Sequence, residues 1–188
     1  LMIIPPFDHP EIIAGQGTVG VEILEDCDQV STIYVPIGGG GLISGVGAAV
    51  KQMQPGVRVV GVEPEGGAAM CASITIGKPV TLERVQSVAD GLLPVRPGDL
   101  TFAHVTEFVD DVITVKDEEI IQAVKWLMTT AKQVVEPSGA ATVAAVLFAS
   151  GGARLAHQGM TVAVLSGGNI ADELLVSLFA ETDRSSCE

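Results

Sequence analysis

Short runs of β-branched and other apolar residues alternate along the chain with longer stretches typical of helices. Apolar runs of strand length occur at 32–35, 57–63, 108–115 and 161–165. The stretches between them predict helices at 42–53, 68–76, 117–133, from the break at 136–139 to about 157, and from 166–169 to about 180. The segment 78–98 holds three prolines and two glycines, which predicts a loop.

Repeated strand, turn and helix units in this order predict an α/β fold. We expect three layers, with a mostly parallel sheet and helices on both of its faces. The continuous apolar character of the strands agrees, because parallel strands are buried on both sides. Ligands in such folds bind beyond the carboxyl ends of strands. Two glycine loops have that placement, at 38–41 and at 166–169.

Composition narrows the classes of protein that remain. Hydrophobic residues make up 47% of the 188 residues and charged residues only 18%, which excludes a disordered chain. Ten basic and 23 acidic residues give a net charge of −13, which argues against nucleic-acid binding. No apolar run reaches the roughly 18 residues of a membrane span. Cys27, Cys71 and Cys187 form no C-x-x-C pair, which favours a reducing cytoplasm over a disulfide framework or a zinc site.

Four consecutive glycines, 38–41, follow one predicted strand and open a predicted helix. Ordering four glycines is costly in entropy, and a plain turn needs only one or two of them. Backbone N–H groups at a helix start favour a phosphate. The dinucleotide pattern G-x-G-x-x-G fails, because Ile43 and Ser44 occupy the positions of its third glycine. Glu63 nevertheless lies where a ribose-binding acid is expected, so a nicotinamide-dependent oxidoreductase stays an alternative.

Six short motifs occur in order along the chain, at 14–18 (AGQGT), 35–42 (VPIGGGGL), 61–65 (GVEPE), 89–91 (ADG), 136–140 (EPSGA) and 166–169 (SGGN). Together they resemble motifs of the fold-type II enzymes that depend on pyridoxal phosphate, the tryptophan synthase β group. Within that group they are most similar to threonine dehydratase (threonine ammonia-lyase) and serine racemase. The resemblance covers nearly the whole chain, and six ordered motifs are more specific than a single glycine loop.

The resemblance implies a role for each of several residues. The backbone of the glycine loop would hold the cofactor phosphate, Ser166 would hydrogen-bond the pyridine nitrogen, and Glu136 would lie near the ring. Simpler roles stay open, with Ser166 as a helix cap and Glu136 as a surface acid. The expected cofactor-binding residues are Gly38, Gly39, Gly40, Gly41, Leu42, Gly91, Glu136, Ser166 and Asn169.

The resemblance also implies a cation site. Glu63 would be a metal ligand, together with the carbonyl of residue 67 and an acid at residue 69. Gly67 can still offer its carbonyl, but Ala69 has no oxygen to replace the acid. A magnesium, calcium or monovalent ion at Glu63 and Gly67 would therefore be one protein ligand short.

The family's Schiff-base lysine, in a Ser-x-Lys-x-Arg motif, is missing. We expect Lys51 and the pair Lys125 and Lys132 on helices, and Lys78 and Lys116 in loops, so that none is catalytic. We therefore expect an N-terminally truncated chain that is inactive alone. Residues 1–10 would end a smaller domain or a connection, 11–180 would form an incomplete cofactor-binding domain, and 181–188 a frayed tail.

For the intact protein the resemblance implies β-elimination from hydroxy amino acids. L-Threonine would give 2-oxobutanoate and ammonia, and L-serine would give pyruvate. The alternative within the family is serine racemization, towards which an acid at residue 69 would have pointed. We expect a small hydroxy amino acid as substrate, a homo-oligomer (dimer or tetramer), and no nucleic-acid or membrane partner.

Overall fold

A parallel sheet forms the centre of the computed structural model, which describes residues 4–148 and 159–180. Its strand order is β3-β2-β1-β4, and the pairings are parallel. β1 (Val30–Pro36) lies between β2 (Arg58–Pro64) and β4 (Met160–Ala163), and β3 (Asp111–Val115) flanks β2. β1 is buried along almost its whole length, as its unbroken apolar run predicts.

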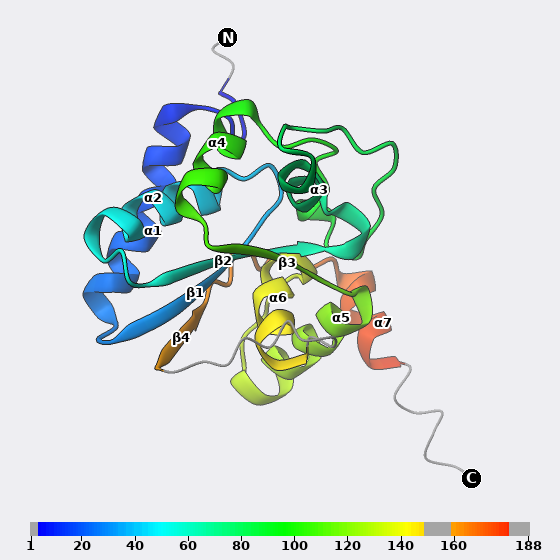
Figure 1. Cartoon of the computed structure of the whole chain (residues 1–188). Coiled ribbons are helices and arrows are strands. Elements are labelled where there is room, and N and C mark those ends of the chain that lie inside the picture. The colour runs from blue at the N-terminus through cyan, green and yellow to red at the C-terminus, as the bar shows by residue number, and fades with distance from the viewer. Residues whose placement is uncertain (1–3, 149–158, 181–188) are drawn as a thin grey trace.

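Four helices pack on one face of the sheet (Figure 1). They are α1 (Pro10–Asp26), α2 (Gly41–Met53), α3 (Ala69–Ile76) and α4 (Asp99–Phe108). Ile33 and Val35 of β1 point into this layer, because alternate residues of a strand face the same side.

The opposite face carries α5 (Asp117–Trp126), α6 (Pro137–Val143) and α7 (Asp172–Ala180) (Figure 1). Tyr34 of β1 and Ile120 of α5 belong to the core on this side. Helices α5 and α6 each run into a π-helical turn, at 127–131 and 144–148. The predicted three-layer α/β fold is therefore confirmed.

Two helices of the first layer were not predicted. The buried stripe of α1 consists of Ile13, Gly17 and Gly20, and glycine contributes little hydrophobic signal. A Cβ on Gly20 would lie 3.0 Å from the carbonyl oxygen of Val46, so the glycines allow α1 to lie close against α2. Helix α4 extends to Phe108, and the strand expected to begin there starts only at Asp111.

Other boundaries also differ from the sequence-based expectation. The helix expected to open at 166–169 begins at Asp172, after an irregular stretch at 164–171. The α-helix predicted to reach residue 133 gives way to its π turn after Trp126, and Lys132 lies beyond that turn with a φ of 59°. The expected tail at 181–188 and the end of the alanine-rich helix at 149–157 lie outside the described residues. Among the described helices, none has the length and apolar character needed to cross a membrane.

Candidate functional site

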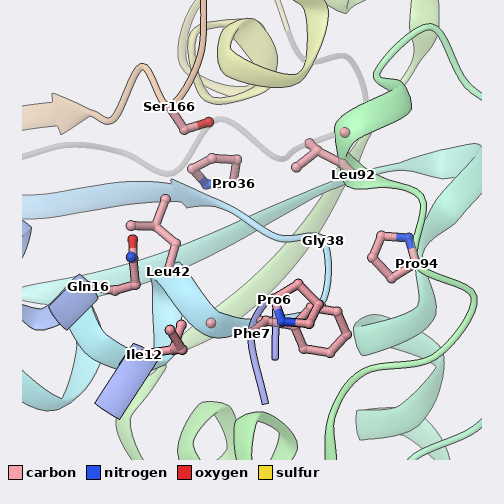
Figure 2. Close-up of a pocket in the computed structure, with 14 residues that line it drawn as sticks. Pro6, Phe7, Ile12, Gln16, Pro36, Gly38, Leu42, Leu92, Pro94 and Ser166 are labelled. Atoms are coloured by element: carbon pink, nitrogen blue, oxygen red, sulfur yellow. The ribbon is translucent and has the colours of Figure 1, made fainter. Parts of the chain in front are cut away.

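The two glycine loops meet at one pocket of about 490 Å³, at the carboxyl ends of β1 and β4. Figure 2 shows Ser166 on one side of this pocket and Phe7 on the opposite side. Apolar side chains form much of the wall between them. The lining residues are Pro6, Phe7, Ile12, Gln16, Pro36, Gly38, Gly39, Gly40, Gly41, Leu42, Gly91, Leu92, Pro94 and Ser166.

The first glycine loop joins the end of β1 to the start of α2. Gly40 precedes the helix with a φ of 95°, a conformation that glycine adopts without steric cost. No side chain caps the N-terminus of α2. The first N–H groups of a helix have no partner inside it, and the positive end of the helix dipole lies at the same place. The loop can therefore bind an anion through its backbone.

Neighbouring protein groups also require these glycines. A Cβ on Gly39 would overlap the ring of Phe7, and one on Gly41 would lie 2.9 Å from Cβ of Phe7. A Cβ on Gly38 would lie 3.2 Å from the carbonyl oxygen of Gly91. Close packing within the protein thus accounts for glycines whose run the sequence analysis attributed to phosphate binding. Sequence reasoning missed Phe7, although it lies between Pro6 and Asp8 in a distinctive Pro-Pro-Phe-Asp-His-Pro run.

Gly91 lines the pocket and is held there by the 136–140 motif. Its N–H donates to Oγ of Ser138 at 2.9 Å and to Oδ1 of Asp90 at 2.9 Å. Ser138 is buried in the first turn of α6. Two motifs 47 residues apart are therefore joined directly at the pocket wall.

The second glycine loop packs against the start of α6. The N–H of Glu136 donates to the carbonyl oxygen of Gly167 at 3.2 Å, and a Cβ on Gly167 would overlap the Glu136 carboxyl group. Ser166 itself lines the pocket. The alternative of Ser166 as a helix cap is wrong, because α7 begins six residues later, at Asp172. Glu136 and the exposed Asn169 lie outside the described lining of the pocket.

Glu63 is fully buried and faces α3. Its Oε1 accepts the N–H of Met70 and its Oε2 accepts that of Cys71, both at 2.8 Å. Burial raises the pKa of the Glu63 carboxyl to about 7, although these two hydrogen bonds act to lower it. The described residues contain no cluster of three or more His, Cys, Asp or Glu side chains that could hold a metal. The cation at Glu63 and Gly67 stays a prediction.

The described lining of the pocket includes no lysine. Lys51 lies on α2, where its Nζ forms an ion pair with Asp110 at 2.7 Å and donates to the carbonyl oxygen of Val57 at 2.8 Å. Lys125 is on α5 and Lys116 immediately precedes that helix. Lys132, expected on a helix, instead follows a π turn.

Comparisons with known proteins agree with this arrangement. Residues 1–169 match the family model described as pyridoxal-phosphate dependent enzyme. The chain is 46% identical to an L-threonine ammonia-lyase of Thermotoga maritima over 170 residues, which are 90% of this chain and 41% of that protein.

Two solved structures are also similar. The processed threonine deaminase isoform 2 of Solanum lycopersicum has a TM-score of 0.88 and 34% identity, over 97% of this chain and 53% of that one. Maize serine racemase has a TM-score of 0.83 and 39% identity, over 93% of this chain and 53% of that one. The chain thus spans about half the length of these relatives, or somewhat less. On the match to the family model, it belongs to the family of pyridoxal-phosphate dependent enzymes.

Proposed function

We propose that the chain supplies the phosphate-binding and ring-binding residues of a pyridoxal-phosphate dependent ammonia-lyase. Its substrates are L-threonine, converted to 2-oxobutanoate and ammonia, and L-serine, converted to pyruvate. The observation that carries this proposal is the meeting of the 38–41 loop, Gly91 and Ser166 at one pocket. The similarity to a threonine ammonia-lyase and a threonine deaminase supports the substrate class.

The residues present fit the cofactor. A pocket of about 490 Å³ lies within the range of cofactor sites, about 300–1,000 Å³. The uncapped start of α2 and the glycine loop offer N–H donors and a positive dipole for the phosphate. Ser166, across the pocket from Phe7, offers a hydroxyl to the pyridine nitrogen. Apolar neighbours such as Leu92 and Pro94 lower the local dielectric, which strengthens these hydrogen bonds.

The chemistry follows from the type of group at each place. Pyridoxal phosphate, when bound, supplies an electron sink for a carbanion at the substrate α-carbon. Ser166 presents a neutral hydroxyl, which does not hold a proton on the pyridine nitrogen as a carboxylate would. A weaker sink favours prompt loss of the β-hydroxyl over reactions that need a long-lived carbanion. The glycine loop anchors the phosphate, and Gly91 forms part of the wall.

Serine racemization is the second candidate, because maize serine racemase is 39% identical to the chain. Ala69 has no side-chain oxygen for the cation site that the family resemblance implies, which favours the lyase. The nicotinamide alternative is excluded by the family to which the chain belongs. Glu63 has a structural task instead, since both of its carboxylate oxygens accept N–H groups of α3.

The test uses the protein expressed from its complete coding sequence, with L-threonine and L-serine as substrates. We expect 2-oxobutanoate and pyruvate, detected by a coupled dehydrogenase assay, to exceed D-serine measured by chiral chromatography. Replacing Ser166 by Ala should lower kcat/KM about tenfold or more, because one hydrogen bond to the cofactor is lost. Ser177→Ala, at an exposed position of α7, is the matched control. D-Serine as the main product from L-serine, with no 2-oxoacid, would refute the lyase.

A further inference from the structure

Residues 6–8 are named the strap here. Figure 2 shows two of them, Pro6 and Phe7, beside the glycine loop on the side away from Ser166. Pro6 and Phe7 line the pocket. The Phe7 ring packs against Gly39, and the Phe7 Cβ and backbone pack against Gly41, so closely that neither glycine could carry a side chain. The strap therefore contacts the backbone that binds phosphate in the proposed function.

Asp8 fixes the strap to the start of α4. Its Oδ1 accepts the N–H groups of Leu100 at 3.0 Å and Thr101 at 3.1 Å, and its Oδ2 accepts that of Asp99 at 3.1 Å. The residue before the helix, Gly98, has no side chain to cap it. Asp8 thus serves as the cap from 91–93 residues away in the sequence. A carboxylate at a helix N-terminus is stabilised by the backbone donors and by the dipole.

Helix α4 in turn holds the glycine loop. Thr101 is fully buried, and its Oγ1 donates to the carbonyl oxygen of Gly39 at 2.7 Å. A Cβ on Gly40 would lie 2.9 Å from Cβ of Thr101. The glycine loop is therefore held from two directions. Phe7 packs against it and is tied to α4 through Asp8, and Thr101 of α4 is hydrogen-bonded to it directly.

We propose that Phe7 and Asp8 are positioning residues that hold the glycine loop in its anion-binding conformation. Phe7 fixes the position of the loop backbone, and Asp8 fixes Phe7 by tying the strap to α4. The Asp8 carboxylate accepts three backbone N–H groups of α4, so its charge is balanced by that helix rather than directed at the start of α2. The proposal rests on the proposed function and extends it to residues remote from the loop in sequence.

The test measures dissociation constants of pyridoxal phosphate and of inorganic phosphate, by fluorescence and calorimetry. It uses the protein expressed from its complete coding sequence. We expect Asp8→Ala to raise both dissociation constants about tenfold or more, since a charge-assisted cap of α4 is lost. We expect Asp8→Asn to stay within about threefold, because its oxygen can still accept the Leu100 and Thr101 donors. Gly98→Ala tests the same contact from the α4 end, because the added Cβ would overlap the Asp8 carboxylate and displace it. It should raise both dissociation constants about as much as Asp8→Ala does.

Asp26→Ala is the matched control, since it removes an exposed carboxylate at the far end of α1, roughly 25 Å from its start. At saturating cofactor, kcat of Asp26→Ala should stay within about twofold of that of the unaltered protein. If Asp8→Ala folds and binds both ligands as tightly as the control, the positioning role of the strap is refuted and the proposed function still stands. If Asp8→Ala does not fold, Gly98→Ala and Phe7→Leu decide by the same comparison. Failure of the unaltered protein to bind either ligand refutes both proposals.

Discussion

Substituting Gly139 by Ala tests how the pocket wall is assembled. A Cβ on Gly139 would lie 2.5 Å from the carbonyl oxygen of Gly167, 2.8 Å from its nitrogen and 2.9 Å from Cγ1 of Val135. Two of these three neighbours are backbone atoms, which cannot rotate away as the end of a flexible side chain can. The loop that carries Ser166 would have to move by about 1 Å to restore an ordinary contact.

The energetic cost follows from two opposing effects. Overpacking in a close-packed site costs about 1–3 kcal/mol. Ala gains up to about 1 kcal/mol over Gly in a helix, and Gly139 is in α6, which reduces the net cost to about 0–2 kcal/mol. With a urea m-value of about 2 kcal/mol/M, the unfolding midpoint should fall by up to roughly 1 M. Because Ser166 moves with the loop, pyridoxal phosphate binding should weaken as well.

Gly15→Ala is the control for this experiment. Gly15 is an exposed position of α1 where an added Cβ meets no atom within 4 Å. The substitution should therefore stabilise the chain by about 0.5–1 kcal/mol through helix propensity alone. The unfolding midpoints of both variants in urea are measured on the purified chain, with circular dichroism as the signal. If Gly139→Ala raises the midpoint as Gly15→Ala does, the close packing of α6 on the second glycine loop is refuted.

Three further outcomes are expected. Because the raised pKa of Glu63 favours protonation in the folded state, unfolding free energy should fall by up to about 3 kcal/mol as pH rises from 4.5 to about 7. Urea midpoints should fall with pH across that range, and Glu63→Gln should reduce this pH dependence. A pH dependence that the substitution leaves unchanged would contradict the role of Glu63. Thr101→Val should lower stability by about 1–2 kcal/mol, because the carbonyl of Gly39 loses its hydrogen bond to the buried Thr101 hydroxyl, and equal midpoints would contradict this. Borohydride should leave no pyridoxal phosphate attached to the 188-residue chain alone; labelling detected by mass spectrometry would show that one of its lysines reacts.

The sheet and the place of the site could be predicted because their signals are local. The runs at 32–35 and 57–63 are apolar enough to indicate buried parallel strands, and β1 and β2 contain them almost entirely. A parallel sheet then places the 38–41 and 166–169 loops at the same edge. Helix α1 escaped prediction because glycine, rather than a larger apolar residue, lines most of its buried face.

Contacts between distant residues could not be predicted, because they leave no periodic pattern. Asp8 caps a helix 91 residues away, and neither residue type nor spacing indicates that pairing. The four glycines illustrate the same limit. Their run indicates a phosphate-binding loop, but the sequence could not say that Phe7, Thr101 and Gly91 lie close against the loop backbone. The burial of Glu63 could likewise not be predicted from the sequence, since an acid at a strand end is equally typical of ribose binding.

The contacts around the pocket explain why its motifs occur together in one chain. Gly38 lies against Gly91, Gly91 is bonded to Ser138, and the adjacent Gly139 lies against Gly167. Together these links join the 38–41 loop to the 166–169 loop through packed backbone and the Ser138 hydroxyl. Displacing one member therefore shifts its neighbours, since close-packed backbone has little room to absorb the change locally. Binding of the phosphate and of the pyridine ring should consequently be coupled, and a change at Gly139 should weaken inorganic phosphate less than the complete cofactor.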